Sequence, residues 1–137
     1  MPHAPLNLGM LSFAHVHAPA YAALLRAMPD AALVAIADDD RARGEGAARK
    51  YGAVYVADYG ALLARADIAA VVVCAPNVEH RALVVAAAAA GKPALCEKPL
   101  ATTYADGAAM IAACRQADVP LMTAFPMRFS PPVIALR

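Results

Sequence analysis

A chain of 137 residues is long enough for one domain with a real core, and a formal net charge of +1 gives no electrostatic reason to expect a nucleic-acid partner. Although 61% of the residues are hydrophobic, the longest uncharged apolar run, from 82 to 90, is too short to cross a bilayer, which takes about 20 residues. We therefore predict neither a nucleic-acid partner nor a membrane partner.

The N-terminus and the cysteines point to an intracellular protein. The opening MPHAPLNLG lacks the basic region and the long apolar stretch of a signal peptide. Cys74, Cys96 and Cys114 are widely spaced and form no CxxC pair, which favours neither a disulfide framework nor a zinc site. We expect a cytoplasmic location and three thiols that behave as small buried hydrophobes.

Apolar runs alternate with helical patterns along the whole chain. Strands are predicted at 6–11, 33–37, 54–56, 69–74, 94–96 and 121–124, and helices at 19–28, 41–51, 59–65, 78–90 and 103–117. The strands are apolar throughout, which is typical of strands buried on both faces. The pattern predicts an α/β fold over residues 1–124: a doubly wound parallel sheet of about six strands in three αβα layers, the Rossmann fold. Ligands bind such sheets at the carboxyl ends of the strands.

The first strand leads into a loop, residues 12–17, where a dinucleotide-binding fold has its phosphate turn. Laid on the G-x-G-x-x-G fingerprint, Ser12, Ala14 and His17 occupy the three glycine positions. Serine and alanine are small enough to meet part of the demand for a tight turn, whereas histidine is large. The loop is weak evidence by itself, yet Ser12, Phe13, Ala14, His15 and His17 are its candidate cofactor contacts.

His15 and His17 leave three interpretations open. They are ordinary loop residues near a helix start, or their ring N–H groups join the helix N-terminus in contacting an anion. Metal binding is the third interpretation and ranks last, because no carboxylate or third ligand lies nearby in the sequence. No metal site is predicted.

Three aspartates end the second strand. Asp38 lies about twenty residues beyond the phosphate turn, the spacing at which an acid accepts hydrogen bonds from the adenosine ribose of NAD. Asp39 or Asp40 is expected to cap the helix that begins near Arg41. Because Arg41 and Arg43 could instead meet a 2′-phosphate, NAD is the predicted cofactor and NADP stays open.

The fourth strand is followed by APNVEH, residues 75–80. Pro76 favours an extended turn, Asn77 is predicted to cap the next helix, and the backbone from Ala75 could lie along the nicotinamide half of a dinucleotide. His80 lies one turn into that helix, where a histidine is more often packed or solvated than catalytic.

The fifth strand ends in CEKPL, residues 96–100. Glu97 and Lys98 cannot both be solvated if neighbouring strand ends converge there, and a partly desolvated lysine beside a cofactor can donate or accept a proton. The competing interpretation is a salt-bridged strand end. Pro99 fixes the backbone and is a candidate for a cis peptide bond.

The segments AIADDD, APNVEH, AGKPALCEKPLA and PMRFSPPV, in this order and spacing, resemble the N-terminal nucleotide-binding domain of the glucose-fructose oxidoreductase and inositol dehydrogenase family (Gfo/Idh/MocA). The resemblance covers essentially the whole chain, and E-K-P following A-G-K is its most specific element. Members of this family are NAD- or NADP-dependent oxidoreductases that commonly act on sugars and cyclitols.

The resemblance implies a role for each matching residue. Asp38 corresponds to the ribose-binding acid, and Asn77 and His80 to the turn that lines the cofactor. Glu97 and Lys98 correspond to the motif whose lysine contributes to proton transfer and substrate binding. Lys98 is therefore the predicted catalytic residue.

By the same resemblance, residues 125–137 begin the connection to a C-terminal domain that this chain lacks, with Arg128 near the crossing and among the candidate cofactor contacts. In the family that domain supplies most of the pocket for the sugar-like substrate, usually a catalytic histidine, and the oligomer interface. We expect the chain alone to be inactive and the enzyme to be a homo-oligomer. The apolar end, FSPPVIALR, is expected to be exposed and to self-associate.

Two other classes of protein compete with this hypothesis. A receiver domain matches in length, but its acidic cluster should follow the first strand, and the strand that should end in a phosphorylatable aspartate ends in Cys74. A non-catalytic Rossmann-fold binding or scaffold protein is favoured by the turn without glycines and disfavoured by Asp38 and Lys98. We predict the NAD(P)-binding domain of an oxidoreductase that transfers hydride between nicotinamide and a sugar-, cyclitol- or polyol-type substrate.

Overall fold

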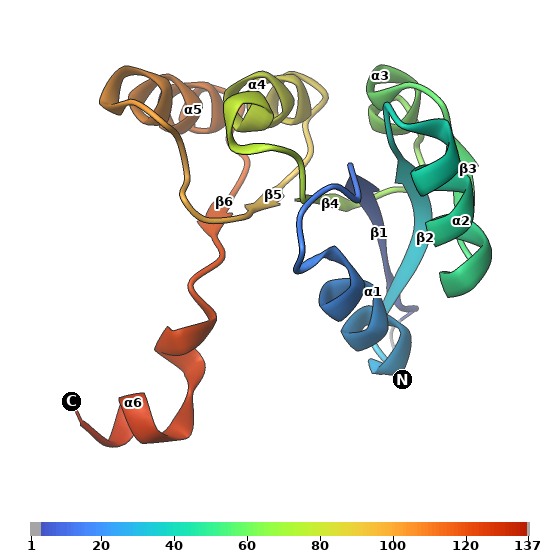
Figure 1. The fold of residues 1–137 in the computed structure, drawn as a ribbon. Coiled ribbons are helices and arrows are strands. Elements are labelled where there is room, and N and C mark those ends of the chain that lie inside the picture. The colour runs from blue at the N-terminus through green and yellow to red at the C-terminus, as the bar shows by residue number, and fades with distance from the viewer. Residues whose placement is uncertain (1–3, 137) are drawn as a thin grey trace.

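A computed structural model describes residues 4–136 as a parallel β-sheet with helices on both faces (Figure 1). The sheet holds six strands: β1 (Leu6–Leu11), β2 (Ala31–Ala37), β3 (Val54–Val56), β4 (Ala70–Val73), β5 (Ala94–Cys96) and β6 (Leu121–Thr123). They are ordered β3-β2-β1-β4-β5-β6, and every neighbouring pair is parallel. The predicted doubly wound Rossmann fold is confirmed.

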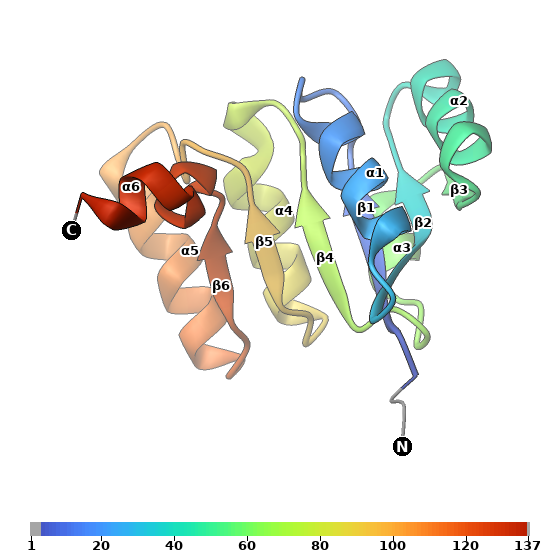
Figure 2. The same cartoon turned by 90° about the horizontal axis from the view of Figure 1, so that it is seen from below.

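The helices cover the sheet from two sides, α1 and α2 on one face and α3, α4 and α5 on the other (Figures 1 and 2). Their bounds are α1 (Ala18–Ala27), α2 (Arg41–Tyr51), α3 (Tyr59–Leu63), α4 (His80–Ala89), α5 (Tyr104–Gln116) and α6 (Pro131–Ala135), with the 3-10 helices η1 (Asn77–Glu79) and η2 (Pro126–Phe129). Within the described residues no helix has the length and apolar character needed to cross a membrane.

Two apolar cores fill the spaces between the layers. The core beside α1 and α2 includes the strand residues Met10, Ile36 and Val72. The core beside α3, α4 and α5 includes Leu11, Val71 and Val73. Consecutive residues of one strand thus enter different cores, because successive side chains point to opposite faces of a sheet. This is why the central strands β2 and β4 are apolar at every position.

Local chemistry sets the ends of α2. The Asp40 side chain accepts a hydrogen bond from the Arg43 amide (3.0 Å), which satisfies one of the free N–H groups of the first turn. Gly52 follows the last turn with a left-handed φ of 73°, a conformation that glycine adopts without strain. The predicted bounds of α2 and its aspartate cap are confirmed.

The turn before α4 corrects the sequence analysis. Asn77 does not cap that helix with its side chain; it is the first residue of η1, and its carbonyl oxygen accepts a hydrogen bond from the His80 amide. Pro76 is extended, as expected, and the chain then tightens into a 3-10 turn before the α-helix begins at His80. The tight turn takes the place of a side-chain cap.

The segment after β6 leaves the body of the sheet and carries η2 and α6 (Figure 1). The sequence analysis predicted five helices and missed α6, a helix of five residues that Pro131 and Pro132 begin. The expected exposure of this apolar end is confirmed by the large side chains after β6, each at least 49% exposed: Phe125, Met127, Phe129, Ile134 and Leu136.

Candidate active site

The carboxyl ends of β1, β2, β4 and β5 meet at one edge of the sheet, where the strand order reverses between β1 and β4. Backbone hydrogen bonds join the loops there. The His15 amide in the phosphate turn donates to the Cys74 carbonyl after β4 (2.9 Å), and the Glu97 amide after β5 donates to Val73 (3.1 Å). The sheet therefore brings together loops that are far apart in the sequence.

Ser12 holds the first turn of this edge in an unusual conformation. Its φ is 65°, in the left-handed region, and its side chain is buried. Its amide donates to the Ala37 carbonyl (2.7 Å), and its Oγ accepts the amide of Ala14 (3.2 Å). The first fingerprint position thus keeps a backbone that suits glycine, but the serine hydroxyl occupies an amide that would otherwise be free for an anion.

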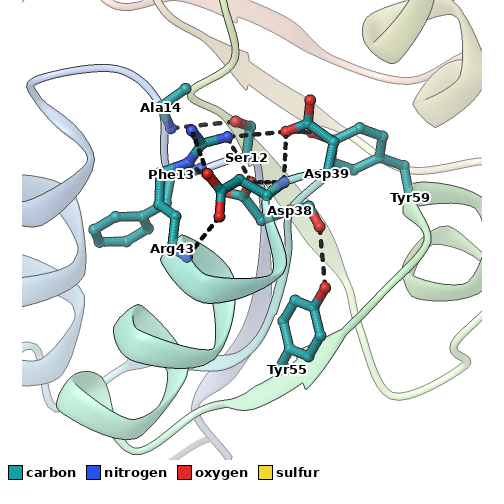
Figure 3. A network of polar contacts seen from close by, with 9 residues as sticks. Ser12, Phe13, Ala14, Asp38, Asp39, Arg43, Tyr55 and Tyr59 are labelled. Carbon is teal, nitrogen blue, oxygen red and sulfur yellow. Dashed lines mark hydrogen bonds and ion pairs between the residues drawn. The ribbon is translucent and has the colours of Figure 1, made fainter.

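Asp38 is the most heavily hydrogen-bonded carboxylate at the site (Figure 3). Its Oδ2 accepts from the Phe13 amide (2.7 Å) and from Arg43 Nε (2.9 Å). Its Oδ1 accepts from the Asp40 amide (2.8 Å) and from Arg43 Nη2 (2.6 Å). A carboxylate offers about four acceptor positions. All of them are filled, and the side chain is fully buried.

Arg43 contacts the whole acidic cluster after β2. Besides Asp38, its Nη2 donates to Asp39 Oδ1 (2.9 Å), and its Nη1 lies 3.8 Å from Asp40 Oδ2. The hydrogen bonds to Asp38 are the main cause of the raised pKa of Arg43, against the effect of burial. One guanidinium faces three carboxylates. The cluster therefore keeps an excess of negative charge.

Of the two arginines named for a 2′-phosphate, Arg41 was the predicted cofactor contact, whereas Arg43 is the one that lies at Asp38. Arg41 is 81% exposed and donates to Glu45 one turn along α2 (2.7 Å). The glycine at position 44 was a sequence signal that α2 packs closely against the end of β2. A Cβ atom there would lie 2.8 Å from the Asp38 Cβ and 2.5 Å from the Tyr55 ring. Only a glycine lets α2 approach the end of β2 closely enough for this contact.

Glu97 turns inward from the end of β5 and binds the phosphate turn. Its Oε1 lies 2.8 Å from His17 Nδ1 and accepts the Tyr21 hydroxyl (2.8 Å), while its Oε2 accepts the Lys98 amide (2.8 Å). Burial favours the neutral acid, but these three hydrogen bonds together lower the pKa of Glu97 below its ordinary value. The side chain is 1% exposed, so an ionised carboxylate lies beneath the turn.

His15 lies beside His17 against the same carboxylate. The two rings are edge to face with centroids 4.8 Å apart, and His15 Nδ1 is 3.9 Å from Glu97 Oε1. The His15 Nδ1 also accepts the His17 amide (3.2 Å). Burial lowers the pKa of His15, with His17 and Lys98 adding to the effect and Glu97 opposing it. Both histidines of the turn thus converge on Glu97.

Lys98 does not pair with Glu97. Its side chain is exposed, and its ammonium has no hydrogen bond or ion pair with any residue from 4 to 136. As predicted, Glu97 and Lys98 are not both solvated. The strand end is paired, as the competing interpretation expected, but the partner of the Glu97 carboxylate is His17 (2.8 Å). The peptide bond between Lys98 and Pro99 is cis, as the sequence suggested.

His80 is a buried link between two loops. One ring nitrogen lies 2.9 Å from the Pro99 carbonyl and the other 3.1 Å from the Ala75 carbonyl, and the ring is fully buried. The resemblance implied that His80 lines the cofactor, but the structure leaves neither ring nitrogen free for a ligand. Pro76 and Asn77 are exposed at the strand end.

Arg128 stands apart from these residues. It is exposed on η2, beyond the edge strand β6. No hydrogen bond or ion pair within residues 4–136 joins it to the residues around the phosphate turn.

Comparison with known proteins gives a consistent family. The model of the oxidoreductase family with an NAD-binding Rossmann fold, Gfo/Idh/MocA, matches residues 8–125. A D-apiose dehydrogenase of Paraburkholderia graminis is 36% identical over 132 residues, which are 96% of this chain and 34% of that protein. An inositol 2-dehydrogenase of Saccharopolyspora erythraea is 33% identical over 134 residues, 96% of this chain and 40% of that protein. The chain thus spans 34% and 40% of the lengths of these two relatives.

Solved structures resemble the fold closely. A putative myo-inositol dehydrogenase from Sinorhizobium meliloti superposes with a TM-score of 0.88 at 33% identity, covering 95% of this chain and 39% of that one. A 3-ketoreductase from Actinomadura kijaniata, in complex with NADP and TDP-benzene, superposes with a TM-score of 0.90 at 30% identity, covering 96% and 41%.

Proposed function

Because this chain belongs to the Gfo/Idh/MocA family of oxidoreductases, we propose that it is the cofactor-binding part of an NAD-dependent dehydrogenase that acts on a sugar- or cyclitol-type substrate. The relatives named above are dehydrogenases of D-apiose and inositol. One observation carries the proposal for this chain: the left-handed turn at Ser12, the strand-end acid Asp38 and the unpaired Lys98 all follow strands whose carboxyl ends meet at the switch point of the sheet.

The residues present fit a dinucleotide once one side chain moves. Ribose hydroxyls need acceptor positions on Asp38, and Arg43 fills two of the four. The Arg43 side chain is 34% exposed, so it can swing into solvent and give up these positions. The two backbone bonds, from Phe13 and Asp40, hold the carboxylate in place meanwhile.

A bound nicotinamide supplies hydride transfer, and the residues of this chain have separate tasks. Asp38 holds the ribose after Arg43 has moved. The exposed ammonium of Lys98 exchanges a proton with a substrate hydroxyl, which is the task of a general acid or base. Glu97 fixes the loop beside it through hydrogen bonds to the phosphate turn.

The charge around Asp38 favours NAD over NADP. A 2′-phosphate brings an additional charge of about −2, as phosphate monoesters carry near neutral pH. Three carboxylates and one guanidinium already face one another at this point, so the added phosphate meets an excess of negative charge. A reversed preference in solution would show that Arg43 outweighs the aspartates.

Calorimetric titration of the chain with NADH and NADPH tests the proposal. We expect saturable binding of NADH that Asp38→Asn weakens about tenfold or more, because a hydrogen bond to a charged group is worth roughly 1.5–3 kcal/mol. Asp39→Asn is the matched control, since Asp39 is exposed and should leave NADH affinity unchanged within about twofold. Circular dichroism checks that both variants fold. A folded chain that binds neither dinucleotide at millimolar concentration would refute the proposal.

A non-catalytic Rossmann-fold binding protein is the second candidate. It is favoured by the Ser12 hydroxyl, which occupies the Ala14 amide, and by the filled acceptor positions of Asp38. The same titration separates the two candidates, since the second expects no dinucleotide binding.

We also propose that the whole protein is cytoplasmic and forms a homo-oligomer. The buried free thiols of Cys74, Cys96 and Cys114 fit a reducing compartment. The exposed apolar side chains after β6 fit a surface that becomes covered.

A further inference from the structure

His15, His17 and Glu97 form a compact set of metal-ligating groups in the phosphate turn. One potential ligand atom from each lies within 4.8 Å of the other two. His17 Nδ1 is 2.8 Å and His15 Nδ1 is 3.9 Å from the same Glu97 oxygen. Zinc binds nitrogen and oxygen at about 2.0–2.2 Å, which places tetrahedral ligands roughly 3.3 Å apart. His17 Nδ1 is closer to the Glu97 oxygen than that spacing and His15 Nδ1 is farther from it, so the His15 ring has to turn and give up the bond that its Nδ1 accepts from the His17 amide (3.2 Å).

From the sequence alone, metal binding by His15 and His17 ranked last because no third ligand was nearby. The two histidines are separated from the carboxylate by about 80 positions, and the third ligand arrives only because β5 ends beside the phosphate turn. Two imidazoles and one carboxylate are the ligand set of several open zinc and iron sites, in which solvent completes the coordination.

We propose that His15, His17 and Glu97 bind a divalent transition metal ion, with Zn²⁺ as the best match. The carboxylate is buried while the His17 side chain is 40% exposed, so the site is closed on the sheet side and open to solvent on the other. An ion held there keeps at least one position for water or an anionic ligand.

Hydrogen bonds from neighbouring groups fix the position of the Glu97 carboxylate, as is typical of metal ligands. The Tyr21 hydroxyl donates to Oε1 and the Lys98 amide donates to Oε2, each at 2.8 Å. Such outer hydrogen bonds orient metal ligands and tune the metal. The Glu97 oxygen that faces the histidines, Oε1, has two partners, the Tyr21 hydroxyl and His17 Nδ1. A metal ion would replace the contact with His17 and leave the hydrogen bond from Tyr21 in place.

Two features limit the affinity. His17 is the N-cap residue of α1, and the partial positive charge of a helix N-terminus opposes a cation. The ammonium of Lys98 lies close enough to influence His15 as well. With three protein ligands and this opposition we expect a dissociation constant on the order of micromolar, weaker than a closed four-ligand zinc site.

A competing explanation of the geometry is a hydrogen-bonded tie between the turn and β5 with no metal. His17→Gln separates the two, because the amide of glutamine can still donate to Glu97 but is a poor ligand for zinc. The metal proposal expects loss of zinc binding with the thermal midpoint of the apo chain kept, whereas the tie alone expects no zinc binding in the wild-type chain either.

Zn²⁺ titration of the 137-residue chain, without an affinity tag and against a chromophoric chelator, is the test. We expect one ion per chain, and a loss of at least about tenfold in affinity for His15→Ala, His17→Gln and Glu97→Gln. Glu79→Gln is the matched carboxylate control and should bind as the wild type does, and Cys114→Ala controls for thiol binding. Neither control residue belongs to the set.

Co²⁺ provides a second readout on the wild-type chain in case a variant fails to fold. Absorption bands of a low-symmetry Co²⁺ site and paramagnetic broadening of the His15 and His17 ring signals are the expected results. The proposal is overturned if Zn²⁺ does not bind saturably at about 100 μM, a hundred times the expected dissociation constant. It is also overturned if binding survives His15→Ala and His17→Gln. It does not depend on dinucleotide binding, so either result leaves the proposed function to its own titration.

Discussion

At the scale of single residues, Ser12 is where the sequence and the fold are in conflict. A left-handed backbone costs a residue with a Cβ atom roughly 1–2 kcal/mol, and Ser12 adopts a φ of 65°. The hydroxyl compensates in part by accepting the Ala14 amide. The Ala14 amide is therefore used in a hydrogen bond within the turn and is not free to bind an anion.

Ser12→Gly should increase NADH affinity severalfold, because it removes the backbone strain and frees the Ala14 amide. Stability should change by less than about 1 kcal/mol, since relief of strain offsets the lost bond. Ser12→Ala is the control: it loses the bond and keeps the strain, so the free energy of unfolding should fall by about 1 kcal/mol. Urea unfolding and calorimetry measure both quantities. A lower NADH affinity for Ser12→Gly would contradict this account of the turn.

Arg43 is the second residue whose replacement is informative. Arg43→Met should raise NADH affinity, because two acceptor positions of Asp38 open. It should lower NADPH affinity below that of the wild-type chain, because the one guanidinium beside the three carboxylates is lost. It should also cost about 1–3 kcal/mol of stability, because a buried carboxylate loses a charged partner.

Arg41→Met is the matched control for Arg43→Met, since its pair with Glu45 is exposed and worth about 0.5 kcal/mol or less. Urea unfolding and dinucleotide titration of both variants provide the measurements. Loss of NADH binding in Arg43→Met alone would show that the arginine itself contacts the cofactor.

At the scale of elements, the link between α1 and the end of β5 holds the site together. Tyr21 on α1 and His17 at its N-cap both reach Glu97 after β5, and His80 joins the ends of β4 and β5 through two carbonyl groups. The strands β4 and β5 are also joined by their own parallel pairing, which these side chains extend to the loops beyond the strand ends.

Tyr21→Phe should lower the free energy of unfolding by about 1–3 kcal/mol, because it removes a hydrogen bond to a buried carboxylate. Tyr104→Phe is the control: Tyr104 is exposed on the first turn of α5, and its loss of a hydroxyl should have no measurable effect. Urea unfolding followed by far-UV circular dichroism compares the two variants. Equal stability for both would mean that the Glu97 network contributes nothing to folding.

At the scale of the whole molecule, two apolar surfaces lie open: the segment after β6 and a groove beside α1. The side chains after β6 are exposed, and an apolar groove of about 400 Å³ lies between α1 and the strands β4 to β6, lined by residues such as Leu24, Leu95 and Met122. Patches of this kind are covered in stable proteins, by the rest of a chain or by a partner.

We expect the chain to self-associate at high concentration through the segment after β6. A double variant, Phe129→Ser with Ile134→Ser, should shift the sedimentation coefficient toward that of a monomer, because both side chains are exposed in the segment after β6. Val78→Ser, which removes an exposed apolar side chain on η1, should leave association unchanged. A wild-type chain that sediments as a single monomer at high concentration would rule the expectation out.

The sequence by itself determined the six strands, the helices α1 to α5 and the order of these elements. Apolar strands, an aspartate cap for α2 and a glycine after it are local signals, because they depend on backbone conformation and on neighbours within a few residues. The position of Asp38 at a strand end followed from the same local pattern. The sequence analysis missed α6 because five residues beginning with two prolines carry no helical period.

The tertiary structure alone decided what each strand-end residue touches. Three findings depend on contacts between elements. Arg43 fills two acceptor positions of Asp38, Glu97 faces the histidines of the phosphate turn, and His80 is a buried link between two loops. Such contacts follow from how closely two elements approach and which way each side chain turns. A linear pattern does not specify either quantity, so the same residues that the sequence placed at one edge became partners only in the folded chain.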